Sequence, residues 1–260
     1  MPSAIVRKPT PEQEELDRKR VELAAVRAAL AERELELADL RAQLKSFEGR
    51  YLRQVGVLYA ELDEWDAKVA ELEAKLNPSA AAQQSAQEAR TRAEDTHEAT
   101  HGEASKAQDF QPSPDLRSLF RDAAKRIHPD FAKDDADQQR RTHLMAQANE
   151  AYSCGDAESL QSILDDYHDS SESVEGEGIG AELIRSIRQL HRARKNIATI
   201  EQKLIELRAS EIAQLKQDVD TAQQEGRDLL DELAASLVAQ IAETKMKHGV
   251  LESEIQNDDR

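Results

Sequence analysis

Residues 114–127 read PDLRSLFRDAAKRI, and HPD follows at 128–130. The segment has helical periodicity, and the apolar side chains of one face are Leu116, Phe120, Ala123 and Ile127. The basic side chains of the other side are Arg117, Arg121, Lys125 and Arg126. Pro129 prevents the helix from continuing and disfavours helical backbone at His128. The sequence therefore predicts a basic helix that ends in a turn presenting His128 and Asp130.

Two further helices are predicted to complete a small apolar core over residues 113–168. The first spans roughly 137–154, Gly155 is suited to end it, and Asp156 is suited to cap the helix that follows. Ser113 is expected to cap the basic helix, with Pro114 in its first turn. A core this small buries a low fraction of its surface, so the excised module is expected to melt at low temperature.

These residues together resemble the J-domain of DnaJ-type co-chaperones. The resemblance covers about residues 112–167 and includes the basic helix, His128-Pro129-Asp130, a charged loop and LMAQANEAY at 144–152. It implies that His128, Pro129 and Asp130 dock on the nucleotide-binding domain of a DnaK-type heat-shock chaperone and stimulate its ATP hydrolysis. It also implies that the four basic residues of the helix meet an acidic face of that partner.

The chain departs from the family at one point. The family's short opening helix, with its Tyr-x-x-Leu-Gly start, is absent, since AQDFQPSP at 107–114 directly precedes the basic helix. The helix after Gly155 is predicted to replace it in packing. A structural scaffold whose module has lost chaperone coupling is therefore the alternative function. The flanking segments also resemble those of uncharacterised bacterial J-domain proteins, at YLRQVGVLYAELDEW (51–65) and EGRDLLDELAA (225–235).

Two long helical arms are predicted on either side of the module, at 11–77 and 179–256. The first begins with a capping pattern at Thr10 and Gln13, and its apolar residues recur at spacings of four and three. Two consecutive four-residue steps, from Phe47 to Tyr51 to Val55, predict a stutter. Gly226 is expected to weaken the helix in the second arm but need not end it. This periodicity, in a chain rich in Ala, Glu, Leu, Arg and Lys, predicts an all-α fold with coiled coils.

The remaining segments carry almost no large apolar side chains. They are a disordered N-terminus at 1–10, a low-complexity linker at 78–112 and an acidic flexible linker at 169–178. The similar lengths of the arms predict either a homo-oligomer or an intramolecular antiparallel hairpin with the module at its tip. The arms are expected to serve oligomerisation, or to bring client proteins or localisation.

Composition excludes several classes of function. The formal net charge of −17 argues against a general affinity for nucleic acid. No segment is long and apolar enough to span a membrane, and the single cysteine, Cys154, forms no disulfide framework. A cytoplasmic protein that is not an enzyme, contacts neither nucleic acid nor membrane and needs no cofactor is therefore predicted.

Two other motifs are interpreted as having no catalytic or metal-binding role. His97-Glu98-Ala99-Thr100-His101 matches a zinc-protease pattern, but its segment lacks an apolar face and a third ligand, so no metal is expected. The basic cluster RSIRQLHRARK at 185–195 is interpreted as a solvated helix face, or as a surface facing the acidic side of the other arm. Contact of this cluster with nucleic acid or a membrane surface is the less favoured alternative.

Overall fold

The computed structural model describes residues 10–102, 110–169 and 178–258, and over these the predicted all-α class is confirmed. Contacts divide the chain into two units: residues 1–43 with 110–209 form unit 1, and residues 44–109 with 210–260 form unit 2. Nearly all of the predicted N-terminal disordered segment and of the acidic linker lies outside the described residues. No described helix is long and apolar enough to cross a membrane.

The first predicted arm is helical over its whole length. Helix α1 (Pro11–Tyr51) passes through a π-helical turn, η1 (Leu52–Gly56), into α2 (Val57–Leu76). The predicted capping pattern is confirmed, because the Thr10 backbone N–H donates to Gln13 Oε1 (2.8 Å) and the Gln13 N–H donates to Thr10 Oγ1 (3.3 Å). The π-helical turn coincides with the predicted stutter, where one irregular turn absorbs the mismatch between helical and apolar periods.

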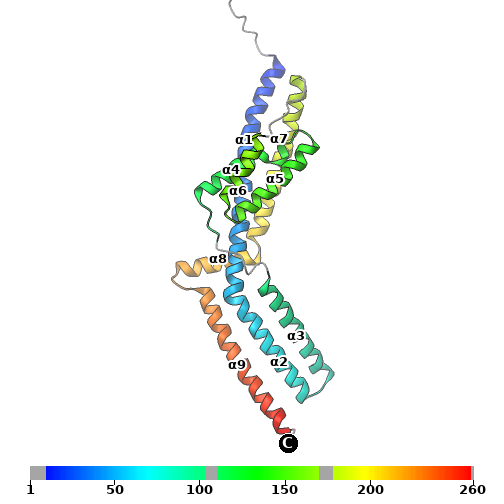
Figure 1. Cartoon of the computed structure of the whole chain (residues 1–260), viewed down its shortest axis with the longest axis vertical. Coiled ribbons are helices and arrows are strands. Elements are labelled where there is room, and N and C mark those ends of the chain that lie inside the picture. The colour runs from blue at the N-terminus through cyan, green and yellow to red at the C-terminus, as the bar shows by residue number, and fades with distance from the viewer. Residues whose placement is uncertain (1–9, 103–109, 170–177, 259–260) are drawn as a thin grey trace, which may run out of the picture. The chain divides into compact units, whose positions relative to one another are not determined.

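In unit 1, α1 packs against α7 (Ile179–Arg208) through an apolar seam that includes Leu30, Leu37 and Leu204. Ion pairs join Arg20 to Glu182 (2.6 Å) and Arg33 to Glu201 (3.3 Å). The residue numbers advance together in both helices, so α1 and α7 run parallel (Figure 1). The predicted antiparallel hairpin with the module at its tip is wrong for this pair.

The module is formed by α4 (Pro114–Ile127), the 3-10 turn η3 (Pro129–Phe131), α5 (Asp135–Ser153) and α6 (Ala157–Asp169). Its predicted local signals are confirmed: Ser113 Oγ accepts from the Leu116 N–H at 3.1 Å, and Gly155 has φ +74°. The core also contains two residues of α1, Ala31 and Leu35. Residues of α6 and of α1 therefore complete the module core together.

Unit 2 differs from the sequence prediction over residues 78–112. Residues Ala80–His101 form helix α3, which runs antiparallel to α2 instead of forming a linker. Buried Ala67, Ala89 and Ala93 lie between these helices, since small side chains allow close approach without large apolar groups. The pairs Arg90–Glu64 (3.0 Å) and Thr96–Asp63 (2.8 Å) flank them.

The second arm is broken twice. After α7 come α8 (Glu211–Gln224) and α9 (Leu229–Asp258), and α2 lies between α3 and α9 (Figure 1). Gly226 has φ +79°, a left-handed conformation that ends the preceding helix. The sequence allowed the helix to continue through Gly226, but it ends there. Asp228 then caps α9 by accepting from the Leu230 N–H (3.1 Å).

Candidate partner-docking site

The His-Pro-Asp turn does not present its histidine to solvent. Helix α4 ends at Ile127, and His128 has an extended backbone (φ −60°, ψ 131°), as Pro129 requires. The predicted helix stop is thus confirmed. The His128 residue is, however, only 1% exposed, while Pro129 and Asp130 are half-buried. The expected exposed histidine is wrong for this conformation, because α1 and α7 cover the turn.

Both ring nitrogens of His128 have partners within unit 1. Nδ1 accepts from the Asp130 backbone N–H at 3.1 Å, so a neutral ring carries its proton on Nε2. Nε2 lies 3.2 Å from Glu34 Oε1 of α1, which is the acceptor for that proton. The side-chain nitrogen Nδ2 of Asn196 on α7 lies 3.3 Å from the same ring nitrogen.

A residue that sequence reasoning missed, Arg141, holds the turn from the module side. Its side chain is buried, and Nη1 donates to the carbonyl oxygens of Arg126 (2.8 Å) and His128 (3.4 Å). It therefore supplies a partner for a carbonyl that the helix end leaves unpaired. Its Nε donates to Asp137 Oδ2 at 2.8 Å. Burial opposes ionisation of Asp137, but hydrogen bonds from Arg140 and Arg141 outweigh it and lower the Asp137 pKa.

Helix α4 carries a basic stripe, formed by Arg117, Arg121, Lys125 and Arg126. Two of these four residues face α1. Arg117 Nε lies 3.3 Å from Asp39 Oδ2, and Arg121 Nε lies 2.6 Å from Glu32 Oε1. Neither nitrogen has the alignment of a hydrogen bond, so both contacts are ion pairs. The other members, half-buried Lys125 and exposed Arg126, make no side-chain ion pair within the described ranges.

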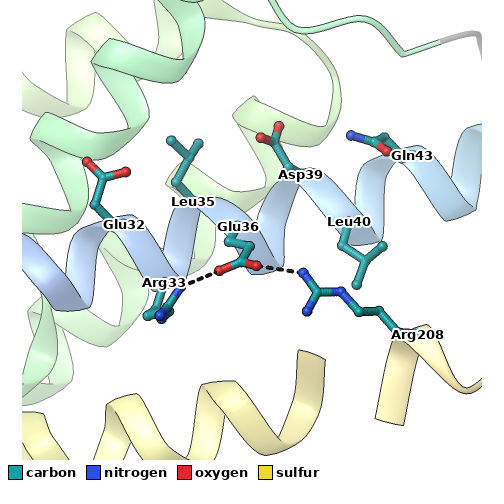
Figure 2. Close-up of a pocket in the computed structure, with 8 residues that line it drawn as sticks. All are labelled: Glu32, Arg33, Leu35, Glu36, Asp39, Leu40, Gln43 and Arg208. Carbon is teal, nitrogen blue, oxygen red and sulfur yellow. Dashed lines mark hydrogen bonds and ion pairs between the residues drawn. The ribbon is translucent and has the colours of Figure 1, made fainter. Parts of the chain in front are cut away.

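Helix α1 presents two different faces to its neighbours. Figure 2 shows Glu32, Leu35 and Asp39 pointing to the side of the module helices, whereas Leu40 points to the side of α7. On the module side, Asp39 also accepts a short hydrogen bond from the Tyr152 hydroxyl. Burial, together with this bond to Asp39, raises the pKa of Tyr152. The module-facing surface of α1 is therefore acidic around an apolar centre.

The hollow drawn in Figure 2 has a volume of about 410 Å³ and contains charges that are already paired. Glu36 lies between Arg33 (2.8 Å) and Arg208 (2.6 Å). The hydrogen bond from Arg208, with a contribution from Arg33, lowers the pKa of Glu36. The site thus joins the two arm helices through Glu36, whose charge is already paired on both sides.

Arg27 of α1 also contacts the turn, next to Phe131. The Arg27 guanidinium carbon lies 4.5 Å above the ring of Phe131, the residue that follows Asp130. Burial, with the nearby charge of Arg141, lowers the pKa of Arg27. Carboxylates on α1 and this stacked cation therefore enclose the turn from the same helix.

The other motifs form no reactive site among the described residues. His97 and His101 stack on α3 with ring centroids 4.1 Å apart, and His101 Nδ1 lies 3.0 Å from the carbonyl oxygen of His97. No group of three or more His, Cys, Asp or Glu positioned to hold a metal ion is present in residues 10–102, 110–169 and 178–258. Cys154 is exposed, and its thiol lies 3.7 Å from Glu150 Oε1.

Comparisons with known protein families, with curated proteins and with solved structures found no match for this chain. What the site can do follows from its geometry alone. It combines a basic helix, a rigid turn and a complementary acidic helix, which suits reversible protein contact.

Proposed function

We propose that the chain is a J-domain-type co-chaperone whose docking surface is closed by its own N-terminal helix. One observation carries the proposal: Arg117 and Arg121, which the resemblance assigns to an acidic face of the chaperone, lie against Asp39 and Glu32 of α1. Helix α1 supplies the charge that a DnaK-type partner would supply. The helix and the chaperone therefore compete for one surface.

The cost of opening is set by what α1 buries. Leu35 is 6% exposed in the module core, and burying a leucine is worth about 2 kcal/mol. Releasing His128 from Glu34 adds about 1–2 kcal/mol, while the partly exposed arginine pairs add less than about 1 kcal/mol each. Together with the hydrogen bond from Tyr152 to Asp39, these contacts keep the surface closed in most molecules, and chaperone binding is weakened in proportion to the fraction that is open.

Single-turnover ATP hydrolysis by a DnaK-type chaperone tests this competition. The opening variant is Glu32→Lys, which places a cation beside Arg121 at a position 55% exposed by side chain. Loss of that pair and the repulsion between two cations together contribute about 1 kcal/mol, which is expected to raise stimulation about fivefold over wild type. Glu14→Lys is the control, since Glu14 is exposed on α1, has no described partner and carries the same charge change.

A coupling-deficient variant is needed that leaves the fold intact. Asp130→Asn meets this need, because Asp130 Oδ2 is buried without a hydrogen-bond partner, so its replacement by an amide breaks no hydrogen bond. In the Glu32→Lys background, Asp130→Asn is expected to abolish stimulation. If neither wild type nor Glu32→Lys stimulates hydrolysis while both are folded, the co-chaperone proposal is wrong.

A scaffold function is the second candidate, and a specific observation favours it. Both nitrogens of His128 are satisfied inside unit 1, which is also how a purely structural histidine is held. In a scaffold the turn would serve to fix the module to α1 and α7. Under this alternative no variant that loosens α1 yields ATPase stimulation.

A further inference from the structure

We infer that a groove beside the turn, on the outer face of α7, binds an acidic segment of a partner protein that carries an aliphatic anchor. The groove has a volume of about 560 Å³ and lies where residues 132–133 meet α7. Its lining includes four basic residues and one exposed aliphatic residue: Lys133, Arg185, Arg188, Arg192 and Ile187. This inference does not rest on the co-chaperone proposal.

The first reason is that the groove contains two arginines whose charges are not paired within the described part of the chain. Other arginines of α7 pair with α1, as Arg194 does with Glu22 and Arg208 with Glu36. Arg188 and Arg192 make no ion pair or hydrogen bond within the described part of the chain. They lie four residues apart on one face, so their like charges repel. An anionic ligand would relieve this repulsion.

The second reason is the surrounding composition. The chain has 52 Asp and Glu against 35 Lys and Arg, so acidic partners for these arginines are abundant. The groove nevertheless collects three arginines and a lysine at one place. A basic concentration on a protein of net charge −17 is the opposite of the average surface and marks it as a recognition patch.

The third reason distinguishes a protein ligand from nucleic acid. Ile187 lines the groove and is 47% exposed, and Ile184, one turn of α7 away from Arg188, is 53% exposed. An aliphatic side chain of a peptide covers such residues, while its carboxylates match the planar arginine groups. The net charge of the chain repels a polyphosphate backbone, which brings no aliphatic group. An acidic peptide therefore fits better.

The groove adjoins the closed turn through two contacts of α7. The Gln189 side chain donates to the Phe131 carbonyl at 3.3 Å, and Asn196 reaches His128 at 3.3 Å. Arg188 is next to Gln189 in the chain, so a ligand at the groove lies close to the turn. The groove does not include Arg117 or Arg121. It therefore stays open to a partner while α1 covers those two arginines.

Fluorescence anisotropy on the full chain tests the inference. The probe is a labelled short peptide of alternating Glu and Leu, titrated at low and physiological salt. Arg188→Glu/Arg192→Glu is expected to weaken binding by at least about tenfold, equivalent to about 1.4 kcal/mol. The control is Lys75→Glu/Arg92→Glu, which makes the same charge change at two exposed, unpaired residues of unit 2 and is expected to bind like wild type.

The apolar anchor has its own variant. Ile187→Ser is expected to weaken binding a few-fold while leaving the salt dependence unchanged, since it removes no charge. The inference is overturned if the peptide does not bind, or if the control variant weakens binding as much as the groove variant. It is equally overturned if a single-stranded RNA or an anionic vesicle binds this face more tightly than the peptide does.

Discussion

Replacement of His128 by alanine is expected to destabilise unit 1, which an exposed docking histidine would not do. The ring is almost completely buried, and its removal leaves the Asp130 N–H and the Glu34 carboxylate each without one partner. Loss of these hydrogen bonds contributes about 1–2 kcal/mol, and the cavity left by the ring adds a similar amount. The expected decrease in the free energy of unfolding is about 3 kcal/mol.

Amide hydrogen exchange followed by mass spectrometry is the appropriate assay, because it reports each unit separately. Fluorescence is unsuitable, since the single tryptophan, Trp65, belongs to unit 2. A loss of about 3 kcal/mol accelerates exchange of the most protected amides of α4 and α5 about 150-fold. His143→Ala is the matched control: His143 lies exposed on α5 and should change exchange by less than about twofold.

The comparison of the two variants also defines the result that would refute the burial of the His128 ring. If His128→Ala and His143→Ala exchange alike, the ring is not buried in solution and α1 does not close the turn. The competition proposed for the chaperone surface would then be wrong, and Glu32→Lys would lose its physical basis as an opening variant.

Three further predictions concern the surroundings of the turn and unit 2. Leu35→Ala should lower the stability of unit 1 by about 3 kcal/mol and increase exchange in α4, although the substitution is on α1; unchanged exchange in α4 would contradict this. The pKa of Asp137 is lowered in the fold, so its stabilising effect is present above its unfolded pKa and lost as the pH falls through its folded pKa. Asp137→Asn should therefore lower the urea midpoint at neutral pH but not at about pH 2, and an equal effect at both would refute it. A Cβ at Gly56 would lie 3.0 Å from Thr100 Cγ2, so Gly56→Ala should cost about 1 kcal/mol less in a Thr100→Ser background; equal cost in both would exclude this contact.

Local signals in the sequence were sufficient to predict the ends of the module helices and the start of the first arm. Pro129 forces the extended backbone at His128, Gly155 adopts a positive φ, and Ser113 caps α4. Each of these outcomes depends on residues within four positions along the chain. The turn, the module helices and the arm start at Thr10 could therefore be predicted without tertiary information.

Tertiary features escaped prediction because their causes lie far apart in the sequence. The acceptor of His128 is 94 residues away, and the amide that also meets its ring is 68 residues away. No local pattern indicates that a histidine in a turn will be covered by such partners. Helix α3 escaped for a different reason: its buried face is made of alanine and threonine, which a search for large apolar side chains does not detect.

The chemistry of the contact between α1 and the module favours a closure that can be reversed. A permanent helix contact gains most from apolar residues, and replacing buried ion pairs with them often stabilises a fold. Helix α1 instead directs carboxylates at the stripe and the turn, with Leu35 as its one large apolar residue in the module core. The closed turn also leaves Asp130 Oδ2 buried without a hydrogen-bond partner, which costs about 1–3 kcal/mol.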